Sequence, residues 1–121
     1  MSYLLVFLGG GLGSLLRYMI GISFQKVIPS LPLATLISNV LACLLFGLTL
    51  WLLQSKENLH TPLRLLLLVG FCGGLSTFSS FGYETFLLFK EQLFLAAALN
   101  IIVSVSLCLI IFYLFYLTPG K

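Results

Sequence analysis

The sequence predicts an all-α membrane protein with four transmembrane helices, the third of which is broken near its middle. Of its 121 residues, 60% are hydrophobic and 7% are charged, whereas an ordinary soluble domain has about 25% charged residues. Four apolar stretches, roughly 3–25, 33–53, 63–89 and 93–117, each have the length of about 20 residues that a spanning helix needs. We therefore expect a single transmembrane domain over residues 1–121 and no enzyme activity.

Polar residues and prolines separate these stretches. They are Lys26 with Pro29 and Pro32, the run QSKENLHTP at 54–62, and the run KEQ at 90–92. With four spans, both termini and the 54–62 loop lie on one side of the membrane.

The basic residues are divided almost evenly between the two sides. One side has Lys56, Arg64 and Lys121; the other has Lys26, Lys90 and, if its side chain reaches that way, Arg17. Orientation normally follows a clear excess of Lys and Arg on the cytoplasmic side. The even division predicts insertion in either orientation, unless these charges are too few to show a bias.

The first span carries small residues four positions apart, at Gly9 and Gly13 and at Gly10 and Ser14. This spacing is typical of a face on which helix backbones pack closely in lipid. Arg17 lies in the same span, and an arginine at the bilayer centre costs about 2.5–3.5 kcal/mol on insertion scales. It is either an anchor at the helix end or a cation at the entrance of an anion path. Its position also argues against a cleavable signal peptide.

Two other spans carry a stripe of polar groups, one per helical turn. The residues are Thr35, Asn39 and Cys43 in the second span, and Asn100, Ser104 and Cys108 in the fourth. Residues four apart share a helix face. Asn39 either bonds to another helix or presents its two N–H groups to a path. The three cysteines, which include Cys72, lack metal-ligand spacing and are expected to be small packing residues.

The third span contains GFCGGLSTFSSFGYE at residues 70–84. Each glycine in a helix costs about 1 kcal/mol relative to alanine, so the pair Gly73–Gly74 before four hydroxyl residues predicts a break near 73–77. Broken backbone at membrane depth must be buried in protein or line a cavity. Its freed carbonyl oxygens suit a hard cation such as Na⁺.

Phe78 and Phe81 follow the break and share a face, because they are three residues apart. The edge of a phenyl ring is positive, so an anion can lie against it while Ser79 and Ser80 donate O–H groups nearby. The alternative is a kinked helix with two aromatic residues in its core.

The polar groups expected to face inward are mostly neutral donors: Asn39, Asn100, Ser104, Ser79, Ser80 and Thr77. The one acid within a span is Glu84. Proton-coupled transport usually requires intramembrane carboxylates, and the other three spans have none. The pattern favours passive conduction of a small anion.

The sequence resembles a known family, the small bacterial fluoride channels (Fluc, or CrcB). The matching segments are GGGLGSLLRY at 9–18, ATLISN at 34–39 and, most specifically, GFCGGLSTFSSFGYE at 70–84. The resemblance implies passive export of fluoride across the inner (plasma) membrane of the cell. It also implies a dual-topology homodimer, in which two antiparallel subunits form two pores at their interface.

The resemblance also implies roles for individual residues. The implied pore residues are Phe78, Phe81, Asn39, Thr77 and the hydroxyl track Ser79, Ser80 and Ser104. Arg17 matches the arginine of the family's first span, with a role at the anion entrance or in the structure. Gly73 and Ser76 would bind a structural Na⁺ through their carbonyl oxygens. The chain departs from the family at Ser76 and Ser80, where threonine is usual, and at Asn100, where tyrosine is frequent. The roles of Glu84 and Asn100 stay open.

The implied partners are fluoride, the lipid bilayer and a second copy of the chain in opposite orientation, and no nucleic acid. Three alternatives remain. A heterodimeric channel would need a paralogue as its second subunit. A small multidrug-type exporter would need a carboxylate in the first span, which has none. A non-transporting assembly subunit would tolerate leucine at Phe78, Phe81 and Asn39.

Overall fold

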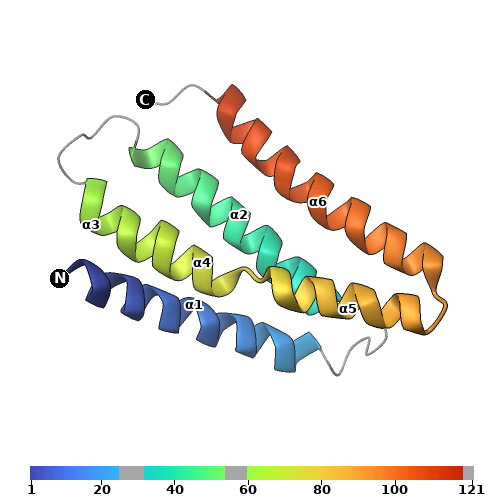
Figure 1. Ribbon diagram of the computed structural model, residues 1–121. Helices are drawn as coiled ribbons and strands as arrows, with labels where there is room; N and C mark the ends of the chain where they lie inside the picture. Colours follow the sequence, from blue (N-terminus) through green and yellow to red (C-terminus); the bar gives the residue numbers. More distant parts are fainter. Residues whose placement is uncertain (25–31, 54–59, 119–121) are drawn as a thin grey trace.

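The computed structural model describes residues 1–24, 32–53 and 60–118, and these residues are helical except at short links (Figure 1). The elements are α1 (Ser2–Phe24), α2 (Leu33–Leu53), α3 (His60–Arg64), η2 (Leu65–Cys72), α4 (Gly73–Leu75), α5 (Phe78–Lys90) and α6 (Phe94–Leu117). Four segments of the described chain are long and apolar enough to span a membrane: Ser2–Phe24, Leu33–Leu53, Thr61–Lys90 and Phe94–Leu117. The predicted four-helix class is therefore confirmed. The separators at Lys26, Pro29 and Lys56, as well as Lys121, lie outside the described residues.

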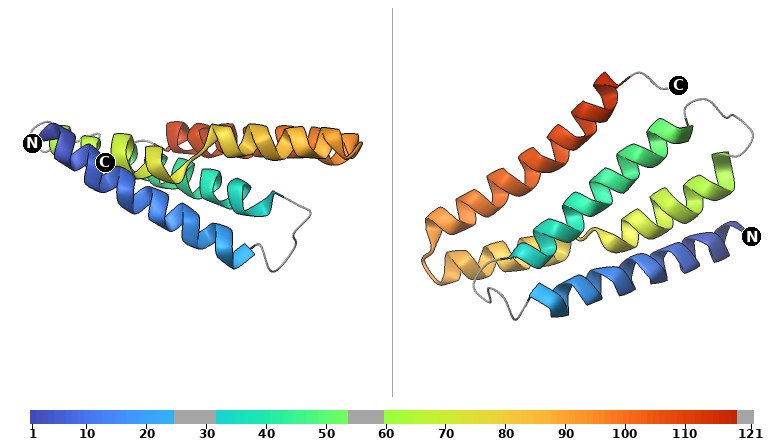
Figure 2. Two further views of the ribbon diagram at one scale, coloured as in Figure 1. Left: turned by 60° about the horizontal axis from the view of Figure 1, so that its bottom comes forward. Right: turned by 180° about the vertical axis from the view of Figure 1, so that it is seen from behind.

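The four passes alternate in direction, so that the start of α1 and the end of α6 lie at the same end of the molecule (Figure 1). Helix α1 packs along η2 and α4, α2 packs along α6, and α5 contacts α6. The two further views show that α5 does not continue the line of α4 but steps away at the link between them (Figure 2). A pocket lies beside this link and is lined by residues of α2, α5 and α6.

The glycine face of α1 is a direct backbone contact, as its spacing predicts. A Cβ added at Gly9 would lie 2.9 Å from the Phe71 nitrogen, and one added at Gly13 would lie 2.8 Å from the Leu75 nitrogen. From the other side, a Cβ at Gly74 would overlap the backbone of Gly10. These positions therefore exclude any larger residue without separation of the helices.

The segment η2 is a π-helix, which the sequence does not predict. Its residues, LLLLVGFC, suit an α-helix and a π-helix equally, because both need only apolar side chains in lipid. π-Helical turns are rare in proteins, and those that occur are often found at functional sites. Here the wide turns lie directly against Gly9 and Gly13 of α1, immediately before the break in the third span.

The predicted break near 73–77 is confirmed, and it lies in the second half of that range, after the glycine pair. Gly73 and Gly74 are helical, and the chain becomes extended at Ser76 (φ −75°, ψ 153°) and Thr77 (φ −151°, ψ 121°). Gly74 packs closely on Gly10, where a side chain would overlap the backbone, whereas a Cβ at Gly73 would meet only the Leu68 carbonyl oxygen. The hydroxyl residues form the break itself.

A tight turn joins α5 to α6, as the run at 90–92 predicts. Gln92 has a positive φ of 60°, the left-handed conformation that ends many helices. The N–H of Glu91 donates to the Leu87 carbonyl at 2.9 Å, and the N–H of Gln92 donates to Phe89 at 3.0 Å. The turn brings α6 back beside the break.

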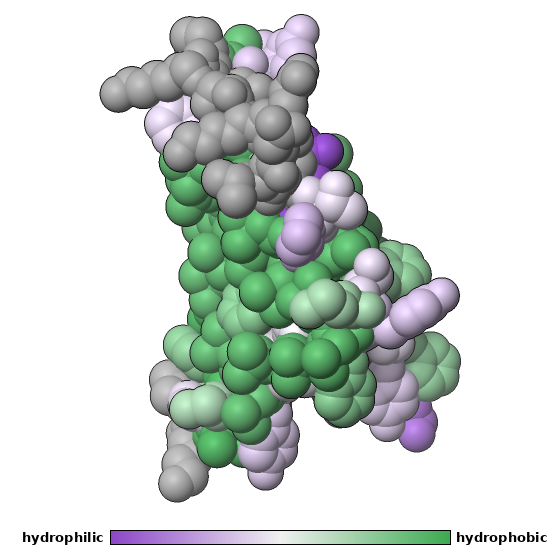
Figure 3. Space-filling view, turned by 90° about the vertical axis from the view of Figure 1, so that its left-hand side faces the viewer, coloured by the Kyte–Doolittle hydropathy of each residue, from purple (hydrophilic) through white to green (hydrophobic). Residues whose placement is uncertain are grey.

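The outer surface is apolar over most of its length. In the space-filling view, hydrophobic side chains cover the middle of the visible face, and hydrophilic ones gather toward its margins (Figure 3). Among the described residues, few large side chains are fully buried within one chain; Leu75 is one of them. A single copy thus relies on lipid, or on another protein surface, to cover its sides.

We predict that Gly13→Ala destabilises the fold by about 1–3 kcal/mol, the usual cost of forcing extra atoms into a packed site. The control is Gly11→Ala, because a Cβ at Gly11 meets nothing within 4 Å and alanine favours a helix by about 1 kcal/mol over glycine. Thermal unfolding in detergent should show a lower midpoint for Gly13→Ala and an unchanged or higher one for Gly11→Ala. Equal midpoints for the two variants would contradict the packing.

Candidate functional site

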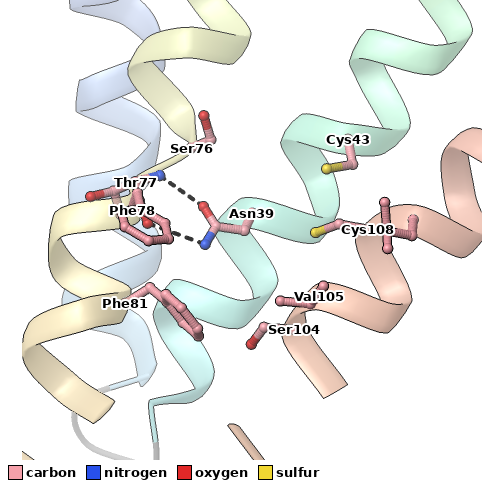
Figure 4. Close-up of a pocket in the computed structure, with 10 residues that line it drawn as sticks. Asn39, Cys43, Ser76, Thr77, Phe78, Phe81, Ser104, Val105 and Cys108 are labelled. Carbon is pink, nitrogen blue, oxygen red and sulfur yellow. Dashed lines mark hydrogen bonds between the residues drawn. The ribbon is translucent and has the colours of Figure 1, made fainter. Parts of the chain in front are cut away.

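An open pocket of about 320 Å³ lies beside the break, between α2, α5 and α6 (Figure 4). Its lining combines polar groups with aromatic and aliphatic ones: Asn39, Cys43, Ser76, Thr77, Phe78, Phe81, Ser104, Val105, Cys108 and Leu109. The two polar stripes predicted on the second and fourth spans thus reach the same space. Within the described residues, no charged side chain lines it.

Asn39 holds the break in place from α2. Its Oδ1 accepts a hydrogen bond from the Thr77 N–H at 2.7 Å, and its Nδ2 donates to the Thr77 carbonyl at 3.3 Å. Both backbone groups of the extended residue are therefore satisfied by one side chain. The two interpretations of Asn39 turn out to be compatible, because it bonds to another helix and also lines the pocket (Figure 4). Its carboxamide has a second N–H that can face the pocket.

Thr77 begins α5 as its N-cap. Its Oγ1 accepts from the Ser80 N–H at 3.2 Å, which satisfies one of the free amides of the first turn. The same Oγ1 lies 3.2 Å from Ser79 Oγ and donates to Ser80 Oγ at 3.2 Å. Ser79 and Ser80 are thus tied to the cap and do not line the pocket, whereas Thr77 does.

The two phenylalanines lie together, as their spacing predicts. Their ring centroids are 5.7 Å apart with an interplanar angle of 44°, and both rings line the pocket. Phe78 is nevertheless 84% exposed in the single chain. The pocket is therefore closed on one side by Phe81 and open past Phe78.

Ser104 brings the fourth span into the site. This buried residue donates to Asn100 Oδ1 at 3.5 Å, and Asn100 Nδ2 donates in turn to Thr85 Oγ1 at 2.8 Å. Thr85 donates to the Phe81 carbonyl at 2.7 Å. Asn100 thus links α6 to α5 one turn from the pocket. Thr85 was not singled out from the sequence, and its only signal is its place one turn after Phe81.

Glu84 is held by Thr35, which donates to its Oε1 at 2.7 Å. Its other carboxyl oxygen, Oε2, is buried without a hydrogen-bond partner among the described residues. Neither residue lines the pocket. The contact joins the start of α2 to α5, and it explains the place of Thr35 in the polar stripe.

The predicted cation ligands lie at the break. In an unbroken helix the Thr77 N–H would donate to the Gly73 carbonyl, but here it donates to Asn39. Gly73 is exposed, and a Cβ there would meet only the Leu68 carbonyl oxygen, 3.9 Å away. Ser76 is extended, and its own hydroxyl donates to the Cys72 carbonyl at 2.9 Å. Carbonyl oxygens in irregular backbone are the groups that hold Na⁺ within membranes, so this segment fits such an ion.

Arg17 and the three cysteines differ in their position relative to the pocket. Arg17 is half-buried on α1 and does not line the pocket. Conversely, Cys43 and Cys108 are wall residues of the pocket, although they were expected only to pack. Their position four residues after Asn39 and Ser104 is the signal that predicts this. Cys72, which is 3% exposed, is a packing residue as expected.

The pocket combines uncharged hydrogen-bond donors with an apolar wall. Amide N–H and hydroxyl groups bind anions without adding a full charge, and ring edges add a weak positive potential. Cations would need carboxylate or carbonyl oxygens directed into the space. The arrangement suits a small anion that gives up its water.

Comparison with known proteins gives an independent result. The sequence matches the family described as CrcB-like protein, Camphor Resistance (CrcB), over residues 4–116. It is 43% identical over 108 residues to "Fluoride-specific ion channel FluC" of Solibacter usitatus, with 88% of each chain covered. A protein of the same name from Shewanella sp. (strain ANA-3) is 43% identical, with 93% of this chain and 91% of the relative covered. One from Pyrococcus abyssi is 40% identical, with 98% and 95% covered.

We predict that Asn39→Ala destabilises the protein by about 1–3 kcal/mol, because it leaves the buried Thr77 N–H unpaired. The control is Thr49→Ala on the same helix, whose hydroxyl bonds only to the Leu45 carbonyl of its own helix at 2.7 Å. Both changes gain similar helix propensity, so their difference isolates the interhelical bonds. The thermal midpoint should fall for Asn39→Ala alone; a matching fall in both variants would rule out the special role of Asn39.

Proposed function

The chain belongs to the CrcB-like family, and from that premise we propose that it is a fluoride-selective channel that exports F⁻ passively through two pores of an antiparallel dimer. It is a multi-pass membrane protein of the plasma membrane and, like its named relatives, an ion channel rather than an enzyme. The observation that carries the proposal is the uncharged donor pocket beside a broken helix, in the middle of an apolar chain. Passive export would lower fluoride inside the cell and relieve its toxicity.

Fluoride is small and strongly hydrated, so a path through lipid must replace its water. In hydrocarbon, each polar group without a hydrogen-bond partner costs several kcal/mol. A passing anion removes this cost while it accepts a hydrogen bond from the group. The free N–H of Asn39 and the ring edges of Phe78 and Phe81 supply such contacts in one pocket. The hydroxyls of Ser104 and Thr77 would join them by turning away from Asn100 and Ser80, to which they now donate. Ser79 and Ser80 continue the hydroxyl track away from it through Thr77.

Selectivity follows from pore width and from the number of donors. Chloride is larger and holds its water less strongly, so it gains less from closely spaced donors and fits a phenyl-lined passage poorly. No charged side chain among the described residues lines the pocket, and a fixed positive charge would trap the ion. Arg17, on α1 outside the pocket, is placed in this proposal at the entrance of the path.

The dimer is supported by what one chain leaves uncovered. Phe78 lines the pocket but is 84% exposed, so in a single copy a polar pocket would open onto lipid. A second copy in opposite orientation would close it, and the two-fold symmetry would produce a second pocket. The even division of basic residues between the two sides agrees with insertion in both orientations.

The proposed structural Na⁺ would lie where the two copies meet. Its ligands would be the carbonyl oxygens of Gly73 and Ser76, since the break takes away the helical donor of Gly73. The bound ion would neutralise carbonyl dipoles that otherwise face one another across the interface. Serine in place of the usual threonine at position 76 leaves a carbonyl ligand unchanged.

We predict that Phe81→Ile lowers fluoride efflux about tenfold or more, because it removes the aromatic edge that contacts the passing anion. A tenfold change corresponds to about 1.4 kcal/mol in the energy barrier. The matched control is Phe89→Ile on the same helix, outside the pocket. Purified protein in vesicles loaded with KF or KCl should release fluoride and negligible chloride once valinomycin lets K⁺ follow. The control variant should release fluoride at the original rate.

Other outcomes of this assay would overturn the proposal or redirect it. Equal release of both anions, or of neither, would contradict a fluoride-selective channel. Release that needs a second, related subunit would replace the homodimer with a heterodimer. A normal rate for Phe81→Ile would remove the ring from the path. Release of neither anion would instead favour a non-transporting assembly subunit.

We predict that replacing Na⁺ by N-methylglucamine at equal ionic strength lowers both the dimer fraction and the thermal midpoint. A bound ion stabilises by about 2.7 kcal/mol at a concentration one hundred times its Kd. The measurement is mass determination and thermal unfolding in the two salts, with KCl as the control for cation size. Identical midpoints in Na⁺ and N-methylglucamine would exclude a structural Na⁺.

A further inference from the structure

We propose that Cys43 and Cys108 form a two-thiol site for a soft divalent cation in the wall of the pocket. Cys43 projects from α2 and Cys108 from α6, the two helices that pack along each other. The close-up shows their sulfur atoms directed toward the same point between the helices (Figure 4). Both residues line the same pocket.

Both thiols are accessible from the pocket. Each is half-buried and free, and each lines the cavity. They lie one helical turn beyond Asn39 and Ser104 on the same two faces, so the pair is adjacent to the donor groups without being part of them. Cys72, by contrast, is buried and does not line the pocket.

The donor set selects the class of ion. Among the described residues, no group of three or more His, Cys, Asp or Glu side chains could hold a metal, so this site offers two sulfur ligands and no third. Zn²⁺ takes four ligands in a tetrahedron and would be held poorly. A soft ion that accepts two sulfur ligands in line, such as Hg²⁺, matches the pair, because soft thiolates select soft metals.

Charge favours a divalent ion over Ag⁺ or Cu⁺. When the ion binds, both S–H groups release their protons to water and two metal–sulfur bonds form. Two thiolates and one divalent ion make a neutral product, whereas a univalent ion would leave a net negative charge. An unpaired charge in an apolar environment is costly, so the neutral bridge is the stable one.

The bridge has a consequence for the proposed function, on which this part of the inference rests. A metal that joins α2 to α6 would narrow the pocket where the anion is proposed to pass. It would also fix the distance between the two polar stripes. Bound Hg²⁺ is therefore expected to block fluoride release.

The direct test is a binding measurement that needs no transport. Cys72→Ser protein, which keeps only the pair, is titrated with HgCl₂, and the remaining thiols are counted with a thiol-reactive dye. One Hg²⁺ per chain should consume both thiols. The same measurement on Cys43→Ser/Cys72→Ser and on Cys72→Ser/Cys108→Ser gives the single-thiol references.

Competition with a small monothiol measures the bridge. Because the second sulfur is held at a high effective concentration, the pair should retain Hg²⁺ at about a hundredfold higher competitor concentration than either single thiol. Zn²⁺ should give no comparable retention. Equal loss of Hg²⁺ from the pair and from the single-thiol variants would overturn the site, as would one thiol consumed per ion.

The transport arm separates this inference from the proposed function. Hg²⁺ should reduce fluoride efflux in Cys72→Ser vesicles about tenfold or more, which corresponds to about 1.4 kcal/mol in the barrier. The monothiol concentration that removes Hg²⁺ from the single-thiol variants should leave fluoride efflux blocked in the Cys72→Ser protein. If the untreated protein conducts no fluoride, the proposed function fails, yet the thiol counts still decide the site. Retained Hg²⁺ with undiminished efflux would show that the site lies off the path.

Discussion

The structure depends on the pair of hydrogen bonds between Asn39 and the backbone of Thr77. A chain that is extended at membrane depth has an N–H and a C=O that no helix satisfies and that water cannot reach. One carboxamide satisfies both, at 2.7 and 3.3 Å. Because a carboxamide is at once a donor and an acceptor, asparagine fits this position and aspartate or leucine would not. With this interaction in place, the third span can stop as one helix and begin again as another without exposing unpaired groups to lipid.

The remaining features follow from where that break lies. The step between α4 and α5 opens the pocket, and the direct backbone packing of α1 on η2 and α4 fixes the first half of the span. Thr77 caps the second half, which presents Phe78 and Phe81 to the same space. Asn100 and Thr85 hold α6 beside it. The pocket therefore has neutral donors on rigid elements, which suits an ion that must exchange its water for protein groups and then leave.

Much of this could be predicted from the sequence because lipid imposes simple rules. Apolar length gave the four spans, glycine spacing gave the α1 face, and the spacing of Phe78 and Phe81 gave their contact. The break was predicted near 73–77 and lies at Ser76 and Thr77. Which of these residues are extended could not be predicted, because a glycine serves as a helix breaker or as a packing residue, and only the contact of Gly74 with Gly10 distinguishes the two. The π-helix had no signal, because its leucines suit either helix. That Ser79 and Ser80 lie outside the pocket could not be predicted, because their bonds to Thr77 depend on the extended conformation of the break.

The most direct measurement is solid-state nuclear magnetic resonance of the protein in lipid vesicles, with the Asn39 carboxamide and the Thr77 backbone labelled. The account predicts a through-space correlation between the Asn39 side chain and Thr77. It also predicts that the Asn39 NH₂ proton signals shift when fluoride is added and stay unchanged in equal chloride. The account claims that the Asn39 carboxamide both holds the break and replaces water around fluoride. Absence of the correlation, or the same response to both anions, would contradict it.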